Sequence, residues 1–287
     1  MRRLPARLPV FLGVLLLLLW SLGPIYWSLV SSLMRPADLV ADPPHYLPPV
    51  WTFEHYGKLL GATSSYFGTE IQSVWPQFKR ALINSIVTSG AATIVTVLLA
   101  ALGGYAFARL RFPGRDLTFA LITATLAIPA YTVMIPLYRI MVAAGLIDTY
   151  LGVTLIYASA FLPLALWLMR SFYAVLPASL EEAAALDGAG RLYTLFRIVM
   201  PLAAPGLIAA ALLTFLSAWG QFVVPLVFSP TLGTKPLTVL IPEFVGKNYV
   251  DYGLMNAAGM LSIIPPVLLV LLLNRYLIRG LTAGATK

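Results

Sequence analysis

Three acidic side chains lie close together in one short stretch and are the first candidates for chemistry. Glu181, Glu182 and Asp187 belong to LPASLEEAAALDGAG and are three of only eleven acids in 287 residues. The residues around them are mostly alanines and glycines, which allow the backbone of a partner to approach closely. Carboxylates on such a turn offer charged hydrogen-bond acceptors. The pattern therefore favours a contact site for another molecule.

Other reactive constellations are missing from the sequence. No G-x-x-x-x-G-K-[ST] phosphate loop is present, so the chain does not bind ATP in that way. Cysteine is absent, which excludes disulfides and thiolate metal sites. The two histidines, His45 and His55, are too few for a metal site built from histidine. We therefore expect no catalytic residue, no metal site and no cofactor bound by this chain.

The composition indicates a membrane protein. The chain is 60% hydrophobic and 10% charged, whereas a typical soluble domain is about 25% charged. Six charge-free runs each reach the roughly 20 residues that a helix needs to cross a bilayer, and none alternates as membrane strands do. We expect an all-α integral membrane protein in a single domain, residues 1–287. Its six predicted spans are 8–34, 81–108, 117–138, 149–169, 198–228 and 252–274.

The N-terminal run resembles a secretory signal peptide. Its apolar stretch is too long for a typical signal, however, and no small-residue cleavage site follows it cleanly. We interpret it as a first membrane span that is retained.

The basic residues predict the orientation of the spans. With the N-terminus in the cytoplasm, six spans return the C-terminus to the same side. Twelve Lys and Arg residues and four acids then lie inside, against seven of each outside. The whole net charge of +8 is therefore cytoplasmic. This orientation places residues 170–197, which contain Glu181, in a cytoplasmic loop and residues 35–80 in an external segment.

The external segments contain short apolar stretches. WTFEHYGKLL is predicted to form a short interfacial helix, and its aromatic side chains suit the headgroup region. Two interpretations of residues 35–80 stay open, a packed cap without a direct role and a surface that binds a partner. A second external loop, residues 229–251, holds the run Leu237 to Val245, which is too short to span the bilayer.

Prolines recur within the predicted spans, most densely in AIPAYTVMIPLY of the third. Pro129 and Pro136 each remove a backbone hydrogen bond. In lipid the freed carbonyl groups must be satisfied by neighbouring helices or by water in a cavity. This segment is the best candidate for an irregular helix that lines a pathway, and an ordinary kink packed in the bundle is the alternative.

No Asp or Glu lies in any predicted span. Carriers that are coupled to protons or sodium usually keep ionisable residues there, so energy for transport is expected to enter through a cytoplasmic contact. SLEEAAAL is strongly helix-forming, with Ser179 as an N-cap and Gly188 ending the helix in a left-handed turn. A solvated loop helix without a partner is the alternative.

The same stretch resembles the signature of inner-membrane permease subunits of ABC importers. That signature reads Glu-Ala-Ala, a glycine a few residues later, and then Ile-x-x-Pro. Here these are Glu182-Ala183-Ala184, Gly188, and Ile198 with Pro201. Further segments of the chain resemble the family in the same order: ALINSIVTSG, YAFARLRFPGRD, IPAYTVMIPLY and RYLIRGLTAGATK. Together they indicate the carbohydrate-uptake branch, and within it the six-span partner similar to the smaller permease of the maltose transporter.

The resemblance implies a non-catalytic, multi-pass subunit in the cell (inner) membrane of a bacterium or archaeon. Its partners would be a second homologous permease, two ATPase subunits at the cytoplasmic face, an external solute-binding protein and membrane lipid, with no nucleic acid. ATP and Mg would be bound by the ATPase subunits. The short cytoplasmic coupling helix between spans four and five would dock on one ATPase. Its coupling residues would be Glu181, Glu182, Ala183, Ala184, Leu186, Asp187, Gly188 and Ala189.

The resemblance also implies a pathway for a solute. The family often has Trp-Asn where this chain has Trp219-Gly220, and whether Gln221 takes over the polar role stays open. Aromatic faces stack on sugar rings and amides bind hydroxyl groups. Packing within the bundle is the alternative for each candidate. The candidate pathway residues are Tyr131, Tyr138, Trp219, Gln221 and Asn256.

The expected function is ATP-driven import of a sugar, either an oligosaccharide or a disaccharide such as maltose, maltodextrin or trehalose. A neutral sugar is favoured because no Arg or Lys lies in a predicted span. The alternatives are an importer permease for glycerol phosphate or another small polar solute, and a stand-alone secondary carrier.

Overall fold

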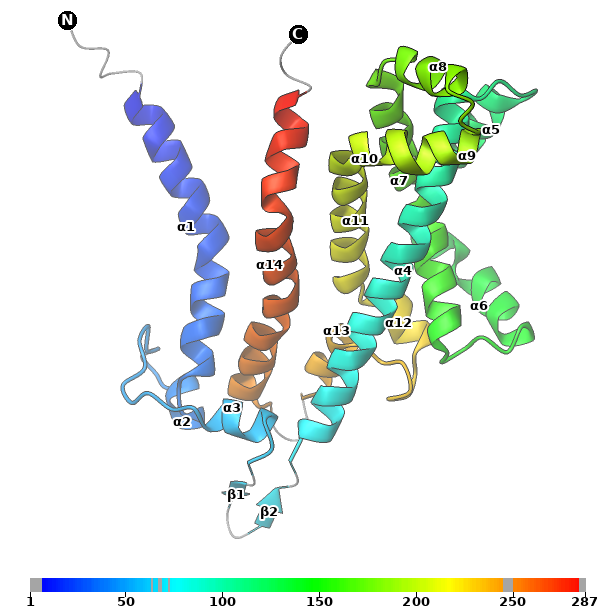
Figure 1. Cartoon of the computed structure of the whole chain (residues 1–287). Coiled ribbons are helices and arrows are strands. Elements are labelled where there is room, and N and C mark those ends of the chain that lie inside the picture. Colours follow the sequence, from blue (N-terminus) through cyan, green and yellow to red (C-terminus); the bar gives the residue numbers. More distant parts are fainter. Residues whose placement is uncertain (1–6, 63, 67–68, 72, 245–249, 284–287) are drawn as a thin grey trace, which may run out of the picture. The chain divides into compact units, whose positions relative to one another are not determined.

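The chain is helical apart from one hairpin in the part that the structure describes. The computed structural model describes residues 7–62, 64–66, 69–71, 73–244 and 250–283 (Figure 1). The chain divides into two compact units, of which the first comprises residues 1–80 and 239–264 and the second residues 81–238 and 265–287. The basic terminal residues Arg2, Arg3 and Lys287, which contribute to the predicted orientation, lie outside the described residues.

Several helices are long and apolar enough to cross a membrane. Among the described residues these are Pro9–Ser32 of α1 (Arg7–Ser32), α4 (Trp75–Arg109), α7 (Tyr150–Val175) and Tyr252–Leu273 of α14 (Tyr252–Ala283). Two further helix pairs pass the same test only when each bent pair is taken together. The predicted all-helical class is confirmed, and the described residues hold four helices that could cross a membrane by length and composition, or up to six if each bent pair is one span.

The predicted third span is broken in its middle. It consists of α5 (Arg115–Ala124), η1 (Thr125–Ala127), η2 (Ala130–Val133) and α6 (Met134–Ala143). The two halves meet at an angle of 95°. The break falls at Ile128, whose extended backbone (ψ 123°) is the conformation that a following proline favours. The irregularity predicted for this segment is therefore confirmed.

The predicted fifth span, 198–228, is not one continuous helix. It is preceded by α9 (Arg191–Thr194) and contains the π-helical η3 (Leu195–Val199), α10 (Met200–Leu202), α11 (Ala204–Trp219) and α12 (Val223–Phe228). The segment Arg191–Leu202 meets α11 at 77°. Ala203 has left the helical conformation at this corner (ψ 8°), and Pro205 occupies the first turn of α11, where no N–H is needed.

The core of the second unit lies between α4, α7 and α11. Helices α7 and α11 pack along each other, and Met169 and Tyr173 of α7 are fully buried. Glycine allows α4 to approach α7 closely. A Cβ atom at Gly104 would lie 2.7 Å from Cβ of Met169 and 3.0 Å from the backbone nitrogen of Arg170. Small residues at such crossings are typical of packed membrane helices.

The first unit contains α1 and several short elements. These are α2 (Pro36–Leu39), α3 (Glu54–Leu59), η4 (Ile241–Phe244) and an antiparallel hairpin of β1 (Ser64–Tyr66) and β2 (Thr69–Ile71). Helix α3 confirms the helix predicted in WTFEHYGKLL. The hairpin was not predicted, because two three-residue strands are too short to produce a recognisable alternation.

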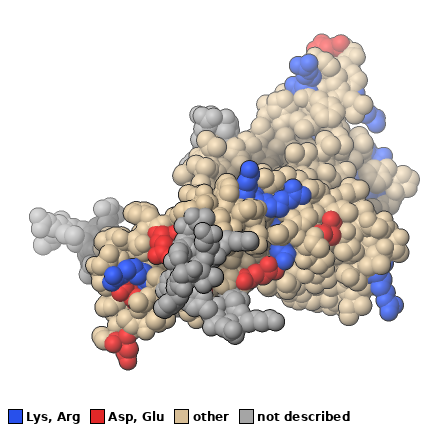
Figure 2. Space-filling model, turned by 90° about the horizontal axis from the view of Figure 1, so that it is seen from below, with Lys and Arg blue, Asp and Glu red and all other residues tan. Residues whose placement is uncertain are grey.

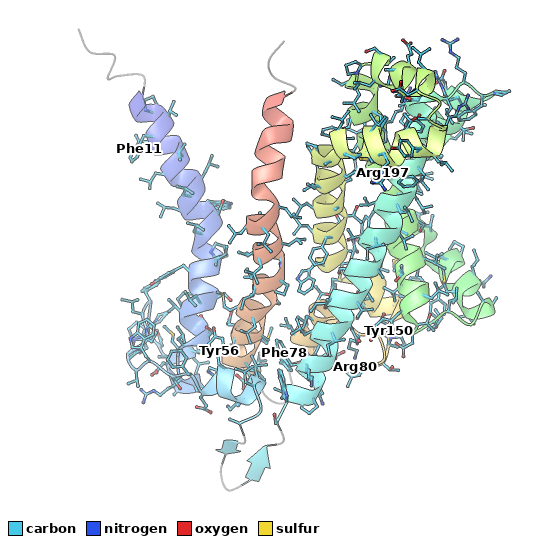
Figure 3. All side chains as sticks on the ribbon, viewed as in Figure 1. Phe11, Tyr56, Phe78, Arg80, Tyr150 and Arg197 are labelled. Carbon is cyan, nitrogen blue, oxygen red and sulfur yellow. The ribbon has the colours of Figure 1, made fainter. Side chains whose placement is uncertain are left out.

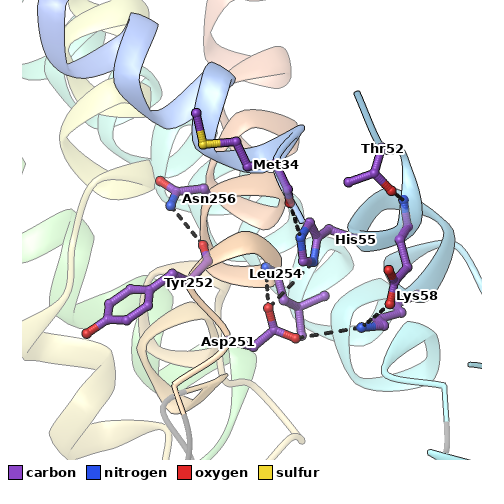
Figure 4. A network of polar contacts seen from close by, with 9 residues as sticks. Met34, Thr52, His55, Lys58, Asp251, Tyr252, Leu254 and Asn256 are labelled. Carbon is purple, nitrogen blue, oxygen red and sulfur yellow. Dashed lines mark hydrogen bonds and ion pairs between the residues drawn. The ribbon is translucent and has the colours of Figure 1, made fainter. Parts of the chain in front are cut away.

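A polar network attaches α3 to the start of α14 within this unit (Figure 4). The ring of His55 is fully buried, with Nε2 2.9 Å from the carbonyl oxygen of Met34 and Nδ1 3.5 Å from Oδ1 of Asp251. The same Oδ1 accepts a hydrogen bond from the backbone N–H of Leu254. Glycine is required beside it, since a Cβ atom at Gly253 would lie 2.0 Å from Nε2 of His55.

Charged side chains are sparse on the face shown in Figure 2, where both signs occur as separate spots among uncharged residues. Apolar side chains are instead exposed along α1, as the labelled Phe11 illustrates (Figure 3). No residue in the most apolar stretch of α1 is buried. A helix that exposes apolar residues all round is suited to a lipid or protein environment rather than to water.

Candidate functional site

The acidic stretch forms a short helix, α8 (Ser179–Leu186), that contacts α9 and η3 at one end of the second unit (Figure 1). Alanine and leucine favour the helix. Glu181 and Glu182 stand in its first turn, next to the positive end of the helix dipole. The predicted cap is corrected: Ala178 holds the N-cap position, and its carbonyl accepts the N–H groups of both glutamates. Ser179 is instead the first residue of the helix.

Gly188 ends α8 as predicted, in a left-handed conformation with φ of +80°. Its N–H donates to the carbonyl of Ala185, and the N–H of Ala189 donates to the carbonyl of Ala184. These two bonds make a Schellman motif, which satisfies the last carbonyl groups of a helix. The turn therefore depends on a residue that tolerates positive φ.

Glu181 faces the end of α4. Its Oε1 lies 2.8 Å from Nε of Arg109 in an ion pair, and its Oε2 accepts a 2.8 Å hydrogen bond from the hydroxyl of Tyr105. The other end of the Arg109 guanidinium donates to the carbonyl of Leu176, just before α8. The ring of Tyr105 also packs edge-on against Tyr173 of α7. Glu181 thus attaches the first turn of α8 to the ends of α4 and α7.

The remaining predicted coupling residues divide by exposure. Ala184 is buried and Ala189 is half-buried. The others face outward, and 90% of the surface of Leu186 is accessible. The outward residues are Glu182, Ala183, Leu186, Asp187 and Gly188. The outward side of α8 therefore combines two carboxylates, small residues and one exposed leucine.

An open hollow of about 600 Å³ lies beside the end of α8. Asp187 and Gly188 line one wall, and Tyr193 and Arg197 of the following segment line the other. The labelled Arg197 lies at the opposite end of the second unit from Tyr150 (Figure 3). The hollow and the outward face of α8 therefore belong to the same end of this unit.

The segment after α8 connects this end to the core. Leu195 and Val199 of the π-helical η3 are buried in the cluster that contains Met169 and Tyr173 of α7. π-Helical turns are rare and occur frequently at functional sites. A displacement of α8 would consequently act on the α7–α11 packing through η3 as well as through Glu181.

The predicted pathway residues do not form one group. Gln221 lines a cavity of about 490 Å³ together with Tyr157 and Phe228, next to the break in the third span. Tyr138 packs against Phe228, with ring centroids 5.9 Å apart. Tyr131, in η2, is 69% exposed.

The other two pathway candidates are engaged in packing. Trp219 stacks on Phe215 of its own helix, with ring centroids 5.6 Å apart. Asn256 belongs to the first unit, where its Oδ1 accepts from Ser28 and its Nδ2 donates to the carbonyl of Tyr252. One hydrogen of Nδ2 and one lone pair of Oδ1 are therefore engaged within the first unit.

Sequence reasoning missed two groups in the second unit. Tyr105 and Arg109 were noted only as parts of a motif and of the charge count, and no spacing signal pairs them with Glu181, which is distant in the chain. Tyr157 lies in an apolar run without a polar neighbour, so nothing in the sequence distinguishes it from a core aromatic residue.

Comparisons with known proteins give a consistent result. The family described as binding-protein-dependent transport system inner membrane component matches residues 97–283. The trehalose/maltose transport system permease protein MalG of Thermococcus litoralis is 31% identical over 282 residues, covering 98% of this chain and 97% of its own. The trehalose transport system permease protein SugB of Mycobacterium tuberculosis is 33% identical over 270 residues, covering 93% of each chain.

The fold also matches a solved structure. A chain in the crystal structure of a bacterial ABC transporter involved in the import of the acidic polysaccharide alginate has a TM-score of 0.80. The match covers 96% of this chain and 98% of that chain at 24% identity. The helical arrangement is therefore shared over nearly the full length.

Proposed function

This chain belongs to the family of inner-membrane components of binding-protein-dependent transport systems, and we propose that it is the permease subunit of an ATP-driven sugar importer. Both of its compact units form one permease domain, which pairs with a second, homologous permease. An external solute-binding protein delivers the sugar. Two ATPase subunits bind ATP and Mg and carry out the hydrolysis, so this chain is not catalytic.

The observation that carries the proposal is the division of α8 into an inner and an outer side. Glu181 is held by Arg109 and Tyr105 of α4, whereas Glu182 and Leu186 are exposed. A partner that binds the exposed side moves α4 through a charge-assisted contact, which is stronger than a neutral hydrogen bond. This arrangement suits a helix that transmits the closure of an ATPase to the membrane spans.

The orientation of the chain is part of the proposal. Both termini and α8 lie in the cytoplasm, as the excess of basic residues favours. Residues 35–80 and 229–251 are then external, and the solute-binding protein docks on that side.

The cavity beside the break in the third span supports a neutral, hydroxyl-bearing solute. None of the described residues that line it is charged. Tyr157 and Gln221, with Thr125 and Ser159, are the polar residues of a largely apolar lining, and apolar sites with a few placed polar groups are typical of small-molecule recognition. An anionic solute such as glycerol phosphate would favour a cation there. The curated relatives named for trehalose and maltose support a disaccharide.

Reconstitution tests this function directly. The chain is combined with its partner permease, its ATPase and its solute-binding protein in sealed vesicles, and the uptake of radiolabelled trehalose and maltose is followed. We expect uptake only with ATP on the ATPase side and with the binding protein on the opposite side.

Two outcomes would contradict the proposal. Uptake by vesicles that contain this chain alone, without ATP, would make it a secondary carrier. ATP-dependent uptake of glycerol 3-phosphate in place of both disaccharides would keep the importer and overturn the sugar.

A further inference from the structure

The segment after α12 is fixed to the rest of the second unit over its whole length. We call this segment, residues 229–238, the strap; it connects α12 to α13 (Leu237–Leu240). Ser229, Thr234 and Leu237 of the strap are buried. A polar connection of this kind is usually exposed and variable. Its burial here therefore calls for an explanation, which begins with the side chains that hold it against the helices.

Asn84 is the centre of the attachment. It is fully buried on α4, and its Nδ2 donates to the carbonyl oxygens of Leu232, at 3.0 Å, and Lys235, at 2.9 Å. Its Oδ1 accepts a 2.6 Å hydrogen bond from the hydroxyl of Tyr150 at the start of α7. Both hydrogens of the amide group are therefore used, and Asn84 links α4, α7 and the strap.

Two neighbouring groups complete the attachment. The hydroxyl of Ser85 accepts the backbone N–H of Leu237 at 2.9 Å. The carboxylate of Asp148, next to the start of α7, accepts hydrogen bonds from the hydroxyls of Thr231 and Thr234. The contacts of Asp148 and Asn84 thus alternate along residues 231–235, and Ser85 binds the strap at Leu237.

The strap in turn holds the wall of the cavity that contains Tyr157. The hydroxyl of Thr238 donates to the backbone carbonyl of Gln221 at 2.6 Å. The backbone N–H of Asp148 donates to the carbonyl of Phe228 at 2.9 Å. Because Gln221 and Phe228 line the cavity, the hydrogen bonds of Asn84 to the strap, the backbone of the strap and the bond of Thr238 to Gln221 together connect Asn84 to the cavity wall.

We infer that Asn84 is a positioning residue for the transport path: it holds the strap, and through Thr238 it fixes Gln221, so that it sets the affinity for the solute without touching it. This inference rests on the proposed function. A carboxylate at position 84 would face two carbonyl oxygens and supply no donor, so Asp keeps the size of the side chain but releases the strap. The two carbonyl groups of the strap would then lose their donor in a buried site, which favours movement of the strap away from Asn84.

The absence of native cysteine allows the strap to be observed directly. A spin label at Leu232→Cys, a side chain that is 37% exposed, reports the strap, and one at Phe222→Cys, 41% exposed, reports the backbone next to Gln221. Asn84→Asp is compared with Thr93→Val, a control on the same helix whose hydroxyl bonds only within α4, to the carbonyl of Ser89.

We expect Asn84→Asp to increase the mobility of both labels. It should also raise the KM for trehalose uptake about tenfold, the effect of roughly one lost hydrogen bond, while the maximal uptake rate and the basal ATPase rate change less than twofold. Thr93→Val should change none of these. Thr238→Val, which leaves Asn84 bonded, should raise the KM and mobilise the Phe222→Cys label alone.

Either of two results would overturn the inference. In the first, the spin label on the strap stays immobile in Asn84→Asp. In the second, the label becomes mobile but the KM for trehalose uptake is unchanged. If Asn84→Asp does not insert into the membrane, two other variants test the inference. Thr238→Val tests the link from the strap to Gln221. Tyr150→Phe removes one of the three hydrogen bonds of Asn84 and tests how firmly Asn84 holds the strap. If the wild-type complex does not carry trehalose, the proposed substrate fails, and the two labels still decide whether Asn84 holds the strap and, through it, the backbone at Gln221.

Discussion

At the scale of residues, two neighbouring glutamates of α8 have opposite surroundings. Glu181 touches Arg109 and Tyr105, whereas Glu182 is exposed. The two residues therefore allow a matched comparison. The same substitution changes an internal contact at Glu181 and the outward surface at Glu182.

Glu181→Gln is expected to lower the free energy of unfolding by about 1–3 kcal/mol, because Arg109 loses its partner in a poorly solvated site. Glu182→Gln should change stability by less than about 0.5 kcal/mol, as exposed substitutions usually do. Thermal unfolding of the purified chain in detergent measures both. Sugar transported per ATP hydrolysed should fall for Glu181→Gln, and equal losses of stability in the two variants would contradict the assigned geometry.

Gly188 and Gly190 make a second matched pair. Neither would bring a new Cβ atom within 4 Å of another residue, but only Gly188 has positive φ. Gly188→Ala is therefore expected to cost about 1–2 kcal/mol in the left-handed turn, and ATP-driven uptake should fall while membrane insertion is kept. Gly190→Ala should transport normally. Rescue by Gly188→Asn, which tolerates this conformation, separates backbone strain from a lost contact.

The sequence predicted the coupling residues as a set but not their division. Adjacent residues of a helix differ in direction by about 100°, so Glu181 and Glu182 cannot share a face. Which of them turns inward depends on Arg109, whose position beside α8 is a property of the tertiary fold. The left-handed Gly188 was predictable, since that requirement is local to the turn.

At the scale of elements, the packing of α4 on α7 depends on a glycine. A Cβ atom at Gly104 would meet Met169 and the backbone of Arg170, whereas one at Gly90 on the same helix would meet nothing within 4 Å. Gly104→Ala is expected to destabilise the chain by about 1–3 kcal/mol, the usual cost of overpacking. Gly90→Ala should be neutral or slightly stabilising in a helix. Melting temperatures of the two variants in detergent test this, and equal values would mean that α4 and α7 pack elsewhere.

The positions of the apolar helices were predictable from hydropathy, but their interruptions were only partly so. Pro129 marks the break in the third span because proline restricts the residue before it. The corner at Ala203 carries no such marker at the residue itself, and no local pattern marks the π-turn before it, whose residues Leu195 and Val199 are buried against α7. The bonds of Asn84 to the strap join residues far apart in the chain, which no local pattern reveals.

At the scale of the whole molecule, the proposed orientation places α8 and the strap on opposite sides of the membrane. Single cysteines at Leu186 and Leu232 test it, since the chain has none of its own. In intact cells a membrane-impermeant maleimide should label Leu232→Cys and not Leu186→Cys, and inside-out vesicles should give the reverse. The opposite result would overturn the orientation drawn from the basic residues.

The attachment of α8 has a mechanical consequence. Within the part of the chain that the structure describes, the polar contacts between α8 and α4 are made through Glu181 in the first turn, while Leu186 lies at the exposed far end. Eight residues of helix extend about 12 Å. Under the proposed coupling role, a push on Leu186 would produce a torque about Arg109, and α8 would act as a lever that pivots on the end of α4. Shortening that lever by one turn, with the contact of Glu181 intact, would reduce the displacement delivered to the membrane spans.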